Sequence, residues 1–208
     1  TPTTTEFANP TGGGGFNTAL EPQTALTYEI GAKSRLSEVT ELELSLFLLQ
    51  IDDELIPFTS PGGRDFFRNV GRSERKGIEL ALEHDLTVDW TWTASYTVMD
   101  AQYREYVTGG GAFSGNREPG IPEHQVFTEL RWRPQHGFFG SIDLQYVDQF
   151  ALNDANTAQN DAYALVNARL GYTKEFKRGT LTPFIALNNL LNLRYNGQTR
   201  LNAFGGRF

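Results

Sequence analysis

Three histidines and one short acidic run are the first candidates for catalysis or metal binding in this sequence. His84, His124 and His136 lie far apart, and no pair has the spacing of a helical zinc motif. The run at 52–54, DDE, is not followed by the alternating acidic and amide ligands of a calcium loop. We interpret it as a solvated turn, and we predict no catalytic residue, no metal site and no cofactor.

Other reactive groups are missing from the sequence or lack the context that they need. There is no Cys, which excludes thiolate chemistry. The glycine run at 12–15 has no following Lys-Ser/Thr and is not a phosphate loop. No G-x-S-x-G motif is present. The net charge of −7 indicates no basic surface of the kind that binds nucleic acid. These observations predict a protein that is not an enzyme and does not bind nucleic acid.

Two polar segments have the residue types of a small-molecule binding surface. Guanidinium groups beside aromatic rings can hold an anionic, ring-bearing chelate through charge and stacking. The first segment supplies Arg64, Phe66, Phe67 and Arg68. The second supplies amides and a carboxylate, at Asn153, Asp154 and Asn156. Both lie in long links between predicted strands or directly beside them, where binding residues are common. We predict that these seven residues contact a ligand.

The elements that must position these residues are β-strands, because apolar and polar residues alternate with period 2. In the second predicted strand Leu42, Leu44, Leu46 and Leu48 lie on one face, opposite glutamate and serine. No run approaches the roughly 18 apolar residues of a spanning helix. The pattern predicts eight strands, at 26–36, 39–51, 67–84, 90–102, 123–133, 138–146, 163–173 and 181–191.

The connections alternate between short and long. Along the chain, short corners near 37, 86, 135 and 176 alternate with long links at 52–66, 103–121 and 148–161. Outer-membrane barrels have this asymmetry, with short periplasmic turns and long extracellular loops. Aromatic residues near strand ends suit the membrane interfaces. The sequence therefore favours an all-β, antiparallel transmembrane β-barrel in contact with outer-membrane lipid.

Two other interpretations of the strand pattern remain open. The first is a complete eight-stranded outer-membrane barrel with a structural or adhesion role, because eight strands can close on themselves. The second is a soluble ligand-binding barrel of lipocalin type, in which the apolar faces form the core. The charged faces of the strands argue against the second interpretation, since such a barrel buries its inner face.

Four motifs, in the same order along the chain, resemble those of TonB-dependent outer-membrane receptors. They are LEPQT at 20–24 with YEIGAK at 28–33, NVGRS at 69–73 with KGIEL at 76–80, IPEH at 121–124, and NNLLN at 188–192 with Tyr195. The resemblance covers residues 20–195. It implies a barrel of about 22 strands around an N-terminal plug. It also implies import of a ferric siderophore or another scarce nutrient, driven through TonB.

The resemblance also predicts how this chain is organised. Residues 1–25 are expected to form a loop that leads into the first strand. Residues 26–208 are expected to form the C-terminal part of the receptor barrel, about eight or nine strands of a larger one. The plug and the region that contacts TonB are expected to lie outside this chain. We expect a fragment that lacks the last strand, located in the outer membrane of a Gram-negative type of cell.

Overall fold

The computed structural model describes residues 8–9, 15–60, 65–108, 111–197 and 202–203. In this part of the chain every regular element is a β-strand. No helix among the described residues is long and apolar enough to cross a bilayer. One nine-stranded antiparallel sheet contains β1 (Thr24–Ser37), β2 (Thr40–Thr59), β3 (Asp65–Asp85), β4 (Trp90–Glu105), β7 (His124–Trp132), β8 (Gly137–Val147), β11 (Tyr163–Phe176), β12 (Gly179–Leu181) and β13 (Phe184–Leu187).

Three short two-stranded sheets lie outside the main sheet, two of them in connections between its long strands. They are β5 (Val107–Thr108) with β6 (Gly111–Ala112), β9 (Phe150–Ala151) with β10 (Gln159–Asn160), and β14 (Tyr195–Asn196) with β15 (Asn202–Ala203). The first two pairs lie in the links predicted at 103–121 and 148–161. These links are therefore partly ordered by their own hairpins.

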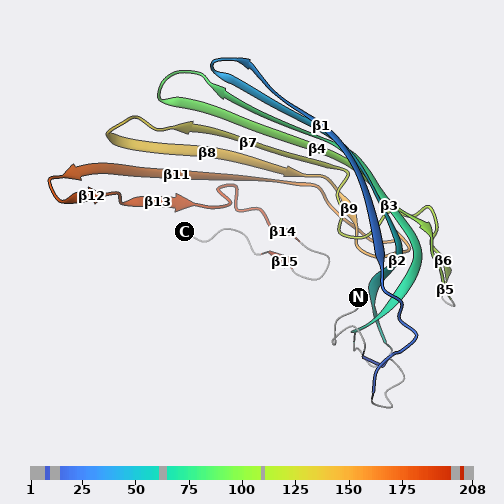
Figure 1. Ribbon diagram of the computed structural model, residues 1–208. Coiled ribbons are helices and arrows are strands. Elements are labelled where there is room, and N and C mark those ends of the chain that lie inside the picture. Colours follow the sequence, from blue (N-terminus) through green and yellow to red (C-terminus); the bar gives the residue numbers. More distant parts are fainter. Residues whose placement is uncertain (1–7, 10–14, 61–64, 109–110, 198–201, 204–208) are drawn as a thin grey trace.

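The long strands follow one another in sequence order across the sheet, which curls into an arched wall (Figure 1). β1 forms one edge, and β12 and β13 together form the other. Within the described residues no hydrogen-bonded pairing joins the two edges. The wall is thus an open segment of a barrel. It is not the closed eight-stranded barrel that was one alternative.

The register keeps each class of residue on one face of the sheet. Directly paired residues in antiparallel strands point to the same side. Leu44 pairs with Ala32 on β1 and with Leu80 on β3, and Leu80 pairs with Tyr96 on β4. On the other face, Ser45 pairs with Glu79. The predicted two-faced strands are confirmed. The alternation within each strand gives the whole sheet one apolar face and one polar face.

The predicted loop at 52–66 is wrong, because β2 and β3 continue through most of it as a long hairpin. Paired residues run from Glu54 opposite Val70 to Thr59 opposite Asp65. The sequence hides this extension because the alternation is interrupted at Asp53, which has a φ of 55°. Beyond Asp53 the hairpin buries Ile56 and Phe66. The acidic run is therefore strand, and the interpretation as a solvated turn is also wrong.

The last predicted strand, at 181–191, is shorter than expected and broken. Pro183 separates β12 from β13, and proline has no N–H for the ladder. After β13 the chain turns at Asn189, which has a φ of 54°. The Asn189 side chain accepts a hydrogen bond from Leu193 N at 2.9 Å and donates one to Leu193 O at 2.8 Å. The NNLLN motif therefore ends the strand.

Two strand glycines make room for aromatic rings on the polar face. A Cβ built on Gly77 would lie 2.7 Å from the ring of Phe47, its cross-strand partner, and 2.3 Å from Val98 O. A Cβ on Gly171 would lie 2.2 Å from the ring of Phe139, again the paired residue. Each ring covers a glycine across the ladder, an arrangement known to stabilise glycine in sheets. The KGIEL motif thus contains a packing glycine.

Candidate functional site

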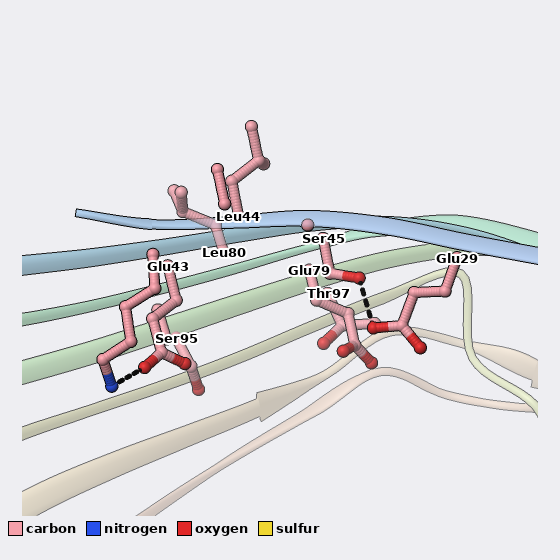
Figure 2. Close-up of a pocket in the computed structure, with 12 residues that line it drawn as sticks. Glu29, Glu43, Leu44, Ser45, Glu79, Leu80, Ser95 and Thr97 are labelled. Carbon is pink, nitrogen blue, oxygen red and sulfur yellow. Dashed lines mark hydrogen bonds and ion pairs between the residues drawn. The ribbon is translucent and has the colours of Figure 1, made fainter.

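The two faces of the wall provide the first functional contrast. Figure 2 shows Glu29, Glu43 and Glu79 pointing into the space inside the curl, together with Ser95 and Thr97, whereas Leu44 and Leu80 point outward. A shallow groove of about 540 Å³ lies among these polar residues. The inside of the curl is therefore wet and acidic along β1–β3, and the outside is apolar.

The height of the outer apolar face fits a bilayer. On β4 it runs from Trp90, which stacks on Trp132 with ring centroids 6.0 Å apart, to Val98, and Asp100 follows it. Nine residues at about 3.3 Å each span about 30 Å along the strand. A strand tilt of about 40° reduces this to about 23 Å, close to the roughly 25 Å height of the apolar band in outer-membrane barrels. Large apolar side chains on this outer face of the wall are exposed, and Ile30 on β1, for example, is 72% exposed.

A belt of charged residues ends the apolar face toward the long loops. Arg104 Nη2 lies 2.6 Å from Glu74 Oε1, and Lys76 Nζ lies 3.6 Å from Asp100 Oδ2. These residues face the same side as Leu80 and Val98. Since charges are costly in hydrocarbon, the belt marks the level at which water begins. Everything beyond it lies outside the apolar band.

At the level of the belt and just beyond it, an ion cluster on the inner face joins three segments. The Arg75 guanidinium on β3 lies 2.6 Å from Glu54 on β2 and 2.5 Å from Glu118 in the link after β6. Ser73, fully buried, donates a hydrogen bond of 2.5 Å to Glu54. Arg75 reaches Glu118 over Ala101, the small residue paired with it on β4. The cluster fixes the β2–β3 hairpin to the link that follows.

In this cluster, burial opposes the ionisation of the Glu118 carboxyl. Its side chain is almost fully buried, and burial raises the pKa of its carboxyl above the ordinary value of 4.5. The nearby Glu54 carboxylate raises this pKa further, whereas the hydrogen bond from Arg75 opposes the rise. Two carboxylates share one guanidinium, so the cluster carries an excess negative charge.

A second cluster, centred on Tyr106, joins the same hairpin to the link between β8 and β11. Arg68 Nη2 donates to Tyr106 Oη at 2.6 Å, and Tyr106 Oη donates to Asp154 Oδ2 at 2.9 Å. Tyr103 Oη donates to the other oxygen of Asp154 at 3.1 Å. The Arg68 guanidinium also lies 5.0 Å from the centroid of the Phe58 ring. One phenol thus connects a cation and an anion from distant segments.

The Tyr106 cluster is packed as tightly as a protein core. Tyr106 is 1% exposed and packs with Ile56, Val70, Tyr103 and the partly buried Phe113. Burial raises the pKa of Tyr106 to about 12, and the hydrogen bond to Asp154 adds to the rise. The phenol is therefore neutral at physiological pH and donates one hydrogen bond while it accepts another.

The predicted ligand residues have different places in this arrangement. Arg68 and Asp154, 86 positions apart in the sequence, both contact Tyr106. Phe66 is buried at 4% exposure, with its ring 6.1 Å from that of Phe58. Phe67 is half-buried. Arg64 lies outside the described residues.

The two asparagines of the second segment hold loops in place. Asn156 Oδ1 accepts a hydrogen bond from Arg117 N at 2.8 Å, and its Nδ2 donates to Arg117 O at 2.9 Å. Asn153 Oδ1 accepts from Thr157 N at 3.0 Å within its own turn. Both amides therefore connect backbone segments. Their contact with a ligand stays a prediction.

Sequence reasoning missed the residues that organise this end of the wall. Tyr103, Tyr106, Glu118 and Arg75 were in no predicted set, and the structure places them at the centres of both clusters. No local pattern distinguishes them. Glu118 lies in a predicted loop, and Arg75 occupies an ordinary polar position of a strand. Only the approach of three segments gives them their role.

Comparison with known proteins places the wall among receptor barrels. A family model described as "TonB dependent receptor-like, beta-barrel" matches residues 1–190. The chain is 25% identical over 190 residues to the probable TonB-dependent siderophore receptor PiuA of Acinetobacter baumannii, covering 86% of this chain and 24% of PiuA. It is 26% identical over 198 residues to the ferrioxamine B receptor of Salmonella typhimurium, covering 93% of this chain and 27% of that receptor.

A solved structure has the same fold. The ferric preacinetobactin receptor BauA of Acinetobacter baumannii superposes with a TM-score of 0.71 at 21% identity, over 88% of this chain and 28% of BauA. The chain spans about a quarter of the length of the curated relatives that it matches.

Proposed function

Because the chain belongs to the family of TonB-dependent receptor-like β-barrels, we propose that the protein imports a ferric siderophore or a similar metal chelate across the outer membrane. The outer-membrane location predicted from the strand faces is confirmed by that family. Within the receptor, this chain supplies part of the barrel wall and the loops at its outer end. The observation that carries the proposal is the wall itself, apolar outside, polar inside and capped at one end by packed loops.

The open edges of the sheet support a role within a larger barrel. Unpaired N–H and C=O groups cannot remain in hydrocarbon, so β1 and the β12–β13 edge need neighbouring strands. The chain accounts for about a quarter of each relative, which leaves room for those strands and for a plug. TonB is the proposed energy source, reached through a region outside this chain.

The relatives and the outer clusters support the proposed class of ligand. PiuA is named as a siderophore receptor, and the Salmonella protein as a receptor for ferrioxamine B. Arg68, with Phe58 and Tyr106 around it, offers a cation and ring faces beyond the apolar band. Ferric siderophores offer carbonyl, hydroxamate or catecholate oxygens for such groups. We propose Arg64, Phe66, Phe67, Arg68, Asn153, Asp154 and Asn156 as ligand contacts.

Uptake by whole cells tests the import function. The full-length receptor that contains this chain is expressed in a strain without its own siderophore receptors. Uptake of ⁵⁵Fe is then measured with ferrioxamine B, a catecholate siderophore and ferric citrate. Import of at least one chelate that disappears in an isogenic strain without TonB is expected. No TonB-dependent uptake of any of them would contradict the proposal.

The ligand contacts are tested separately in the same cells. Arg68→Gln removes the cation and keeps a polar side chain, and it is expected to weaken binding of the imported chelate about tenfold, the effect of one charge-assisted contact. Arg178→Gln, at the opposite rim, is the matched control and should bind as the wild type does. Equal affinity in all three proteins would remove Arg68 from the site.

A further inference from the structure

Within the described part of the chain, Arg68 is a cation that has no anionic partner. Its Nη2 donates to the Tyr106 hydroxyl, and its buried Nε has no acceptor. Two other arginines of β3 are paired, since Arg72 Nε lies 2.8 Å and Arg75 Nη2 lies 2.6 Å from carboxylate oxygens of β2. A buried N–H without an acceptor is costly, so an additional anion would stabilise the Arg68 guanidinium.

One atom separates Arg68 from the carboxylate of Asp154. The Tyr106 hydroxyl oxygen accepts from Arg68 Nη2 at 2.6 Å and donates to Asp154 Oδ2 at 2.9 Å. Within the described residues, the cation and the anion form no ion pair with each other. Opposite charges that lie so close together in a half-buried place attract each other. The phenol oxygen therefore stands where a direct ion pair would otherwise form.

The hydroxyl is held in this place by the burial of its ring. Tyr106 is 1% exposed, and its ring packs with Ile56 and Val70. Its single hydroxyl hydrogen points to Asp154, which leaves a lone pair of the oxygen for Arg68. Burial raises the pKa of Tyr106 to about 12, so the phenol is neutral and does not cancel the charge of Arg68. Tyr106 therefore separates the two charges without neutralising either of them.

Two aromatic rings fix the orientation of the guanidinium. Its central carbon lies 5.0 Å from the centroid of the Phe58 ring and 5.5 Å from that of the Tyr106 ring. Such cation–π contacts stabilise the cation but leave its charge unpaired. Arg68 is half-buried, so a ligand can reach the side chain from its exposed side. The arrangement thus presents an oriented cation whose charge is still available.

We propose that Tyr106 is a positioning residue, whose hydroxyl keeps Arg68 apart from Asp154 so that the guanidinium stays available to an anionic oxygen of the chelate. This inference rests on the proposed function, in which Arg68 contacts the ligand. Without the hydroxyl, rotation of the arginine side chain brings it into a direct pair with Asp154. A ligand must then displace a carboxylate before it binds, which lowers its affinity. The pair also draws both side chains from their present positions, so the link at 148–161 loosens although a new contact forms.

A double-mutant cycle on the purified full-length receptor tests this role. The probes are the ⁵⁵Fe complexes of a catecholate siderophore and of citrate, both anionic, and affinity is measured by equilibrium dialysis. Tyr106→Phe is expected to weaken binding of the complex that the wild type binds by about fivefold, an effect within the range of coupled neighbours. In the Asp154→Asn background the same change should have almost no effect, because an amide does not neutralise Arg68.

Tyr103→Phe is the matched control for this cycle. Tyr103 is 2% exposed and donates to the other oxygen of Asp154 at 3.1 Å. The change removes the same kind of hydroxyl from the same core but leaves Tyr106 between Arg68 and Asp154, so affinity should stay as in the wild type. An equal loss from Tyr106→Phe in both backgrounds would assign its effect to packing, and no loss in either would remove the role altogether. Both results overturn the inference.

A crystal structure of the full-length Tyr106→Phe receptor provides a measurement that needs no chelate. A direct Arg68–Asp154 ion pair is expected, with nitrogen and oxygen within about 4 Å of each other. An Arg68 that keeps its place, with water in the position of the lost hydroxyl, would overturn the inference. If the ion pair forms but the receptor binds no chelate, the positioning role stands and the proposed ligand class fails. If chelates are imported while Arg68 keeps its place in the variant, the inference fails and the import function stands.

Discussion

The middle of the wall and its outer end are built on different principles. In the middle, large apolar side chains such as Ile30 and Ile185 are about 70% exposed. At the outer end, Val70, Tyr103 and Tyr106 are at most 2% exposed. The middle has no core of its own and depends on its strand ladder, on lipid and on whatever fills the barrel. The outer end packs against itself, so it keeps its shape in water.

A charge placed on the outside of the middle should have the largest effect. Leu80→Arg puts a guanidinium in the apolar band and is expected to destabilise the barrel by about 2–4 kcal/mol. Ser95→Arg, on the polar face of the neighbouring strand, is the control and should cost much less. Urea unfolding of the full-length protein in liposomes measures both. Equal losses would mean that the two faces do not differ in environment.

Breaking the ion cluster should have the next largest effect, confined to the outer end. Arg75→Met leaves the buried Glu54 and Glu118 without a cation, and loss of one partner from a buried pair costs about 3–5 kcal/mol. Part of this cost is relieved because Arg75 is 26% exposed. We expect faster hydrogen exchange in residues 54–59 and 113–118 and no change in β8. Faster exchange throughout the wall would contradict the division into two regions.

Removal of the Tyr106 hydroxyl should produce a smaller change in the same place. Tyr106→Phe keeps the packed ring and deletes the hydrogen bonds to Arg68 and Asp154, each worth about 1 kcal/mol. The expected result is faster exchange at residues 150–160. Tyr172→Phe, on the apolar face at the other end, is the matched control. An unaffected 150–160 segment would show that packing alone holds this link.

The smallest predicted effect is a pH dependence of the outer end. The folded-state pKa of Glu118 is raised above 4.5, so the folded loops bind its proton more tightly than the unfolded chain does. This contribution to stability is present below pH 4.5 and is lost as the pH rises through the raised value. Glu118→Gln should remove that part of the pH dependence. Proteolysis of the outer loops across this pH range provides the measurement.

The strand pattern could be predicted because its causes are local. The alternation from Leu42 to Leu48 fixes which side of β2 meets lipid, whatever the neighbouring strand is. The long hairpin could not be predicted, because the positive φ of Asp53 shifts the alternation and the apolar residues beyond it no longer form a simple strand pattern. The placement of Arg68 beside Tyr106 joins positions 38 residues apart, which no local pattern encodes.

By itself, the sequence determined the strands, their two faces and the resemblance to a receptor barrel, since hydropathy and motif order belong to each segment alone. The tertiary structure decided which charges lack partners. Arg75 obtains its carboxylates from segments 21 and 43 positions away, whereas Arg133 and Arg169 obtain none among the described residues. Ion pairs form only where the fold brings opposite charges within about 4 Å, because the interaction is weak beyond that distance in water.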